Sequence, residues 1–87
     1  MAKWESVSTL PYNFNYGAAV VYNDEIHILG GGNTNHYAWN GTSWTSKSTL
    51  PYSLQYGHAV VYDGKIHILG GNGYETKHYS WDGTSWR

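Results

Sequence analysis

The chain has no cysteine, only two prolines, and charged side chains at only 13% of its 87 residues. Without cysteine, disulfides and thiolate zinc sites are excluded, although these stabilise many small domains. The formal net charge is −1 at pH 7, so neither a phosphate backbone nor an anionic membrane surface is an expected partner. We therefore expect no nucleic-acid binding and no membrane association.

Long apolar runs are also missing. No stretch approaches the roughly 20 apolar residues of a membrane-spanning helix, and the start, Met1-Ala2-Lys3-Trp4, has no apolar segment of a signal peptide. The sequence predicts a soluble protein that is cytoplasmic where it is expressed. Eleven glycines, nine tyrosines and five tryptophans are present instead, a mixture that favours strands and tight turns.

Two copies of one pattern make up the chain, and we place them at residues 1–44 and 45–87. Matched positions keep a spacing of 40 residues up to the paired glycines, after which the second copy is two residues longer. A period of about 40 to 42 residues suits one four-stranded blade of a β-propeller. The matches are L-P-Y at 10–12 and 50–52, A-V-V-Y at 19–22 and 59–62, I-H-I-L-G-G at 26–31 and 66–71, and G-T-S-W at 41–44 and 83–86.

Turn signals divide each copy into four strands. Asn23-Asp24 and Asp63-Gly64 predict two-residue hairpins with positive φ, and so do Asn40-Gly41 and Asp82-Gly83. No segment has helical periodicity, so the predicted fold class is all-β, with two four-stranded antiparallel blades in each chain. The predicted strands are 18–22, 25–29, about 35–39 and about 43–48 in the first copy, and 58–62, 65–69, 77–81 and 84–87 in the second.

The segment 57–71, followed by Tyr79 and Trp86, resembles the kelch repeat, and the resemblance implies a propeller. The first copy departs from it in having Ala18 where the second has His58. Paired glycines permit backbone angles closed to other residues, and aromatic side chains bury large areas between blades. We therefore assign structural roles to Gly30, Gly31, Tyr37, Trp44, Gly70, Gly71, Tyr79 and Trp86.

Two blades leave an apolar sheet face uncovered at each end of the pair. Because the copies are alike, these faces are complementary, and we expect chains to associate head to tail into a ring. Propellers have about four to eight blades, and kelch rings about six or seven. With two blades per chain the count must be even, so a homotrimer of six blades is expected, with a homotetramer of eight as the alternative.

The N-terminal residues repeat the pattern of the outermost strand, which we place at residues 2–8. In a ring this strand is expected to pair with the last blade of a neighbouring chain and so cover an open sheet edge. Trp86 of that blade competes for a nearly equivalent position, and the sequence leaves open which of the two segments occupies it. The residues of the inter-chain strand are Lys3, Trp4, Glu5, Ser6 and Val7.

Long loops are expected at one end of the ring, where insertions are tolerated and binding groups often lie. Their aromatic and amide side chains suit a carbohydrate or protein ligand, while the ordinary polarity of loops explains the same residues. The candidate binding residues are Tyr12, Tyr16, Asn33, Asn35, Tyr52, Tyr56, Asn72 and Tyr74.

Reactive arrangements of side chains are not recognisable. There is no His-Glu-x-x-His run, no spaced acid pair and no Ser-His-Asp set, so we expect neither an enzyme nor a cofactor. A metal site within one chain is not expected either. A ring of His58 imidazoles around the symmetry axis is the one metal alternative.

Two functional classes remain open. The first is a self-assembling structural or interaction module, either a designed or reconstructed repeat protein or a piece of a longer kelch array. The close similarity of the two copies favours this class. The second is a ligand-binding or lectin-like propeller that uses its long-loop face.

Overall fold

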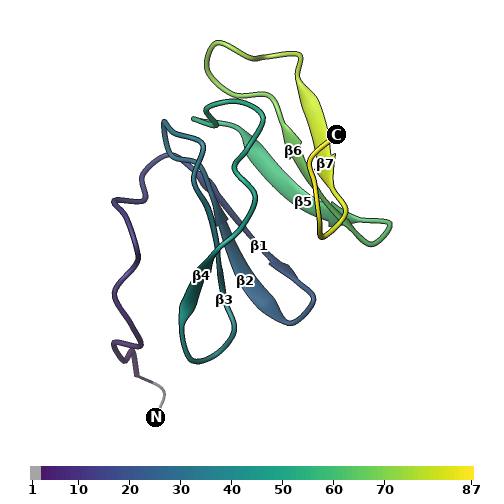
Figure 1. Cartoon of the computed structure of the whole chain (residues 1–87). Coiled ribbons are helices and arrows are strands. Elements are labelled where there is room, and N and C mark those ends of the chain that lie inside the picture. Colours follow the sequence, from purple (N-terminus) through teal and green to yellow (C-terminus); the bar gives the residue numbers. More distant parts are fainter. Residues whose placement is uncertain (1–2) are drawn as a thin grey trace.

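Two antiparallel sheets, packed beside one another, make up the computed structural model, which describes residues 3–87 (Figure 1). Within that range all regular elements are strands, which confirms the predicted all-β class. The first sheet has the order β1 (Ala18–Tyr22), β2 (Glu25–Leu29), β3 (His36–Trp39) and β4 (Trp44–Ser46). The second sheet has the order β5 (His58–Tyr62), β6 (Lys65–Leu69) and β7 (His78–Trp81).

The β1–β2 and β5–β6 hairpins have the predicted two-residue turns. Tyr22 pairs with Glu25 in the first, and both turn residues between them have positive φ, 53° at Asn23 and 66° at Asp24. The Asp63-Gly64 turn has φ values of 53° and 72°. Such turns match the right-handed twist of the strands that they join, so the local sequence alone sets this register.

The β3–β4 hairpin is longer than predicted. Trp39 pairs with Trp44, so residues 40–43 form a four-residue loop. The side-chain oxygen of Asn40 accepts hydrogen bonds from the amides two and three residues later, at 2.8 and 3.0 Å. The two-residue prediction for Asn40-Gly41 and Asp82-Gly83 was therefore wrong, because each Asx side chain caps a wider turn.

The outermost strands are shorter than predicted. β4 ends at Ser46, and the predicted strand 84–87 is reduced to a bridge between Trp81 and Trp86, continued by two hydrogen bonds between Ser80 and Arg87 of 2.8 and 2.9 Å. The second sheet is consequently three-stranded rather than four-stranded. Of the predicted strand 2–8, residue 2 lies outside the described residues, and residues 3–8 form no strand.

The core lies between the two sheets and is closed by the connection that joins them. Leu29 of β2 and Ile66 and Ile68 of β6 are fully buried or nearly so, because alternate residues of a strand point to one face. Side chains at every second position of the connection join them, namely Leu50, Tyr52 and Leu54. The connection between the predicted strands 43–48 and 58–62, expected to be a loop, is therefore part of the core.

The end of β2 requires glycine for two separate reasons. Gly30 has a φ of 72°, and a Cβ atom placed on it would lie 2.6 Å from the Cβ atom of Leu54. The next amide, of Gly31, donates a hydrogen bond of 2.7 Å to the Leu54 carbonyl oxygen. The paired glycines thus let the connection approach the first sheet closely.

Two alanine variants separate these requirements. Gly64 also has a φ of 72° but has open space where a Cβ would stand, so Gly64→Ala is expected to cost about 1–2 kcal/mol of unfolding free energy through backbone strain alone. Gly30→Ala should cost about 1–3 kcal/mol more, because Leu54 must move. Urea unfolding at matched protein concentration measures both. Equal losses would contradict the close approach.

Candidate functional site

Two buried histidines of the first sheet lie where the second sheet packs against it. His27 of β2 and His36 of β3 are each only 1% exposed, and Nδ1 of His27 lies 2.9 Å from Nε2 of His36. The indole ring of Trp81, from the second sheet, packs against both imidazoles, with ring centroids 5.6 and 4.8 Å away. We call the faces of the two sheets that meet here the inner faces, and the opposite ones the outer faces.

The hydrogen bonds fix the neutral tautomers of this pair. The Ser48 carbonyl oxygen lies 3.1 Å from Nδ1 of His36, so Nδ1 donates and Nε2 of the same ring accepts from Nδ1 of His27. Burial lowers the pKa of both rings, to about 4 for His36, whose pKa the neighbouring His27 lowers further. Both rings are therefore neutral at pH 7.

A second imidazole pair has the same placement on the outer face of the second sheet, but there Nε2 of His67 donates to the Tyr62 carbonyl oxygen, 3.2 Å away. Nδ1 of His67 lies 2.8 Å from Nε2 of His78, and the Tyr62 ring packs on His67 as the Tyr22 ring packs on His27. His78, however, is exposed. One pair is thus covered by a tryptophan, and its counterpart is open.

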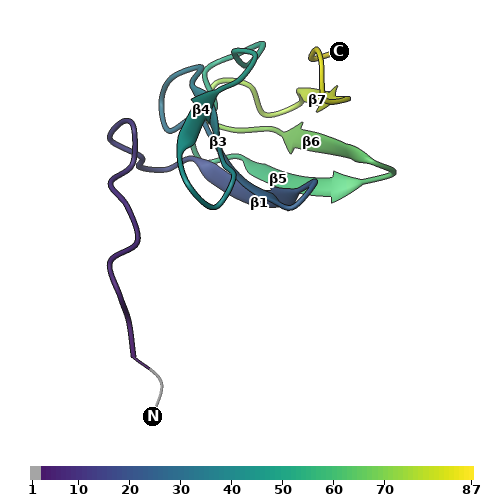
Figure 2. The same ribbon diagram turned by 60° about the horizontal axis from the view of Figure 1, so that its bottom comes forward.

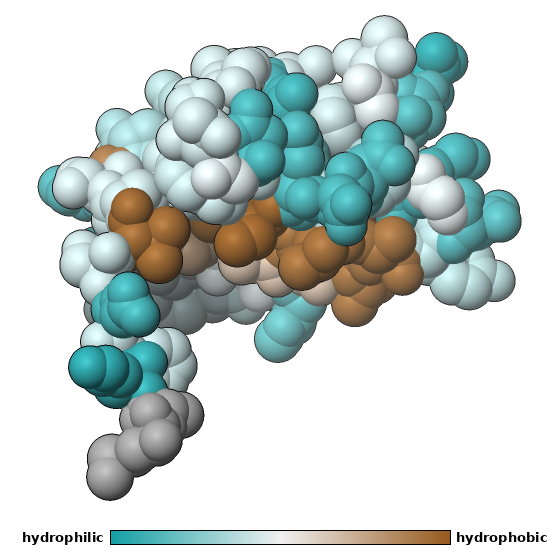
Figure 3. Space-filling model, turned by 90° about the horizontal axis from the view of Figure 1, so that it is seen from below, coloured by the Kyte–Doolittle hydropathy of each residue, from teal (hydrophilic) through white to brown (hydrophobic). Residues whose placement is uncertain are grey.

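The outer faces also expose apolar side chains whose counterparts are buried. On the first sheet, Ile26 is 44% exposed, whereas its counterpart Ile66 on the second sheet is 0% exposed. On the second sheet, Tyr62 is 71% exposed, whereas Tyr22 packs against the core. Apart from the outer faces, Figure 3 shows apolar side chains gathered in a belt across the side of the molecule seen from below. Such surfaces mark interaction sites in soluble proteins.

The N-terminal segment extends away from both sheets (Figure 2). Trp4 is 98% and Val7 77% exposed, and the predicted inter-chain strand 3–7 has no strand beside it within residues 3–87. Ser8, where the segment reaches the first sheet, accepts a hydrogen bond of 3.1 Å from Nε1 of Trp44. The repeat-equivalent contact joins Nε1 of Trp86 to the Ser48 carbonyl oxygen at 3.4 Å.

Of the candidate binding residues, Tyr16 and Tyr56 come together at the long-loop end. Their ring centroids are 4.6 Å apart, both side chains are more than half exposed, and both residues have positive φ, 59° and 62°. The amide of Tyr56 donates a hydrogen bond of 2.8 Å to the Tyr16 carbonyl oxygen, which holds the two corners together. Positive φ is uncommon for bulky residues, so this pair is locally strained.

Tyr12 and Tyr52 instead hold the glycine corners. Their hydroxyls donate hydrogen bonds of 2.6 Å to the carbonyl oxygens of Gly30 and Gly70, respectively. Burial, aided by the neighbouring Tyr37, raises the pKa of Tyr12 to about 12. Tyr52 is only 6% exposed, so these two hydroxyls stabilise the fold rather than face solvent.

The remaining candidates lie in the loops between the second and third strands of each sheet. The side-chain oxygen of Asn33 accepts from the amide of Asn35 at 3.1 Å, which closes a turn. The amide of Asn72 donates to the Gln55 carbonyl oxygen at 2.7 Å, and Tyr74 packs on the ring of Tyr52, 4.8 Å away. The eight candidates therefore fall into several groups and do not line one common site.

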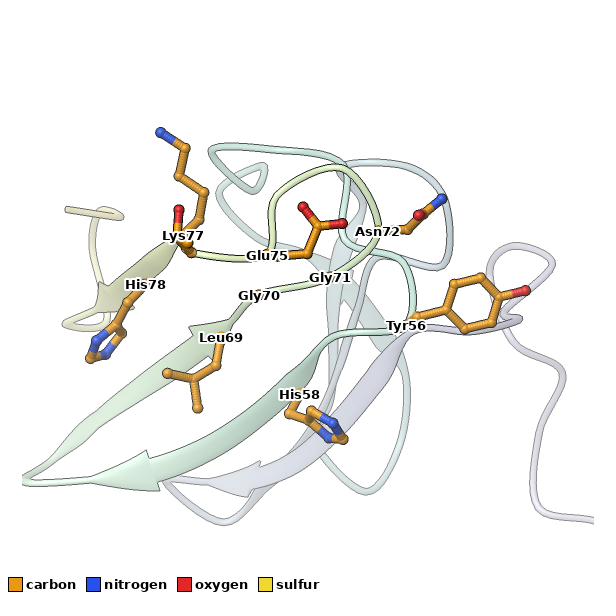
Figure 4. Close-up of a pocket in the computed structure, with 10 residues that line it drawn as sticks. Tyr56, His58, Leu69, Gly70, Gly71, Asn72, Glu75, Lys77 and His78 are labelled. Carbon is orange, nitrogen blue, oxygen red and sulfur yellow. The ribbon is translucent and has the colours of Figure 1, made fainter.

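A cavity of about 610 Å³ opens at the long-loop end of the second sheet (Figure 4). Its floor is formed by His58, Leu69 and His78, and its side by the loop 70–77. Metal ligation is not indicated there: within residues 3–87 no three His, Asp or Glu side chains are grouped so that they could hold a metal ion. His58, named above as the axial metal alternative, is among the residues that line this cavity.

Comparisons with known proteins do not assign the site. No protein-family model matches the chain. No curated protein matches it either. No helix within residues 3–87 is long and apolar enough to cross a membrane. The function is therefore inferred from the geometry of the two sheets.

Sequence reasoning missed both the imidazole pairs and the role of the connection between the sheets. Two signals were present. The histidines recur on neighbouring strands of each copy, and apolar residues alternate in the connection, at Leu50, Tyr52 and Leu54, as they do at 10–14. Alternation of this kind is typical of a half-buried extended segment rather than a solvated loop.

The buried pair predicts acid sensitivity. Unfolded imidazoles take up protons below about pH 6.5, whereas His36 stays neutral down to about pH 4. The free energy of unfolding is therefore expected to fall as the pH drops through this window, by on the order of 3 kcal/mol from His36 once the pH is below both values. Urea unfolding at pH 7, 5.5 and 4.5 measures the slope.

Two histidine variants provide the comparison for this measurement. His36→Asn should be less stable at pH 7 and should lose less stability on acidification, because its titrating group is gone. His27→Asn removes the other ring of the pair and should likewise lose less stability on acidification, because burial lowers the pKa of His27 as well. An unchanged slope in His36→Asn would contradict the assignment.

Proposed function

We propose that the chain is a self-assembling propeller module, in which the outer face of the second sheet packs on the outer face of the first sheet of the next copy. The observation that carries the proposal is the repeated imidazole pair, covered at His27 and His36 and open at His67 and His78. The contact between the two sheets within one chain is thus available a second time, between chains.

Each side chain that forms the contact within the chain has a counterpart in the other repeat that is available for the proposed contact between chains. Trp39 packs beside Trp44 with ring centroids 5.4 Å apart, much as Trp81 packs beside Trp86 at 6.2 Å. In the proposed contact, Trp39 of the next copy lies on the open imidazole pair, in the way that Trp81 lies on the covered pair. Ile26 takes the place of Ile66 and loses its exposure.

The N-terminal segment completes the same contact. In the first sheet the backbone continues beyond β4, where the amide of Lys47 donates a hydrogen bond of 2.8 Å to the His36 carbonyl oxygen. Val7 is the sequence counterpart of Lys47, and His78 that of His36. We infer that residues 6–8 run along β7 of a neighbouring copy, beyond Trp86 and Arg87, which already pair with Trp81 and Ser80, and that they cover the rest of that sheet edge.

The head-to-tail contact closes into a ring when the rotation per chain permits it. The resemblance to kelch repeats favours six blades, hence three chains, and a four-chain ring of eight blades is the other even count within the usual range. Sedimentation and light scattering over a range of concentrations are expected to give three times the chain mass of 9.8 kDa. A folded monomer at every concentration would overturn the proposal.

Paired face variants test the polarity of the contact. Ile26→Glu places a charge on the outer face of the first sheet, and Val60→Glu does the same on the second, where Val60 is 47% exposed. Each variant alone is expected to be monomeric, since it keeps only one intact face. An equimolar mixture is expected to form a complex of two chains, because the two intact faces are complementary and the charged faces prevent closure.

This result distinguishes head-to-tail packing from the packing of like faces. If each face packed against its own copy, each variant would still form dimers alone, through its intact face. Circular dichroism of each variant monitors whether the sheets still form. Val20→Glu alters the covered counterpart of Val60 and is expected to unfold the chain rather than to yield a folded monomer.

A further inference from the structure

The cavity on the second sheet has a counterpart on the first sheet that is filled. There Leu54, 0% exposed, occupies the corner after β2, and its carbonyl oxygen accepts hydrogen bonds from the amides of Gly31 and Gly32 at 2.7 and 2.9 Å. Its own amide donates to the Asn33 carbonyl oxygen at 3.2 Å. An extended segment from the next repeat thus seals this corner with both side chain and backbone.

The same corner of the second sheet is open. A Cβ atom on Gly30 would meet Leu54 at 2.6 Å, whereas one on Gly70 would meet only the Glu75 carbonyl oxygen, at 3.4 Å. Figure 4 shows the loop that carries Glu75 and Lys77 arching over one side of the cavity, with Leu69 and His58 on the strands below. The second sheet therefore has the paired glycines at this corner, but no segment packs against them as the Leu54 segment packs against Gly30 and Gly31 in the first sheet.

We propose that this cavity receives residues 10–14 of a second copy, with Phe14 in the place that Leu54 has in the first sheet. The inference rests on the proposed head-to-tail assembly and specifies one of its contacts. It assigns the cavity to the protein's own chain rather than to a small molecule, although its volume is in the range of ligand sites.

The segment 10–14 is already held in the required position on its own chain. The Tyr12 hydroxyl is bonded to the Gly30 carbonyl oxygen at 2.6 Å, the same contact that Tyr52 makes with Gly70. One side of the segment 50–54 contacts the second sheet through Tyr52, and its other side fills the corner of the first sheet. In the counterpart segment 10–14, the side that corresponds to the corner-filling one is uncovered, and Leu10 is 41% exposed where Leu50 is 5% exposed.

The sizes of cavity and side chain vary together between the copies. In the first sheet the corner loop is closed by a hydrogen bond from Gly30 to Asn35, and in the second by one from Gly70 to Lys77, so the second loop is two residues longer. The shorter loop receives a leucine, and the longer one would receive a phenylalanine. A larger ring in a wider corner preserves close packing, which interiors require.

Photocrosslinking tests the assignment directly. Phe14 is replaced by p-benzoylphenylalanine, and unlabelled chains are mixed with ¹⁵N-labelled chains, unfolded, refolded together and irradiated. Crosslinks to the loop 70–77 are expected, with about half of them joining a labelled to an unlabelled peptide, as random assortment of the two kinds of chain gives. Leu54→p-benzoylphenylalanine is the matched control, and its crosslinks to residues 30–33 should join only peptides of one label.

Assembly of simpler variants gives a second measurement that does not depend on the bulky probe. Phe14→Ala is expected to raise the concentration at which the complex dissociates by at least about tenfold, given the usual cost of emptying such a site. Phe14→Leu, which installs the side chain of the first-sheet corner, should lie between Phe14→Ala and wild type. Sedimentation measures all three proteins.

The outcomes separate this inference from the proposed function. If rings form but Phe14 crosslinks only within its own chain, or if Phe14→Ala assembles like wild type, the inference is overturned and the ring stands. If every protein is a folded monomer, both are overturned. Crosslinks to the loop 70–77 from another chain, together with weakened assembly of Phe14→Ala, establish the cavity as the receiving site.

Discussion

The seating of Leu54 in the glycine corner of the first sheet is the contact on which the two-sheet structure depends. The connection between the sheets is held on the first sheet by backbone hydrogen bonds from Lys47 and Leu50 and by this corner, and on the second sheet by the Tyr52 hydroxyl on Gly70. Because one segment touches both sheets, it fixes their relative position. The core residues Ile66 and Ile68 then meet Leu29 across the connection rather than water.

The buried imidazole pair adds specificity to this packing. Two neutral rings can be buried in an apolar contact when their nitrogens are hydrogen-bonded. Nδ1 of His27 donates to Nε2 of His36, and the Ser48 carbonyl oxygen accepts the proton on Nδ1 of His36. Trp81 then covers both rings with one large side chain. These hydrogen bonds require one register of β2, β3 and the connection. The same pair recurs at His67 and His78, where the proposed contact between chains would cover it.

A contact that joins unlike faces of one repeating unit has a consequence for assembly. Each added sheet covers one face and presents another, so the exposed apolar area does not fall until the series closes. Ile26 and Tyr62 lie at the two ends of such a series within one chain. The open glycine corner and the projecting segment 4–8 lie at the same two ends, which is why the proposed sheet, strand and cavity contacts all join one copy to the next (Figure 1).

The sequence by itself determined the strands of the first hairpin in each copy, 18–29 and 58–69, because alternation and a two-residue turn with positive φ are local properties. It also placed the paired glycines at a close approach. Only the tertiary structure decided that the connection 47–57 is core and that His27 faces His36. It likewise reduced the strand predicted at 84–87 to a bridge. These features depend on which residues of neighbouring strands and of the other repeat come into contact, and no local pattern encodes that.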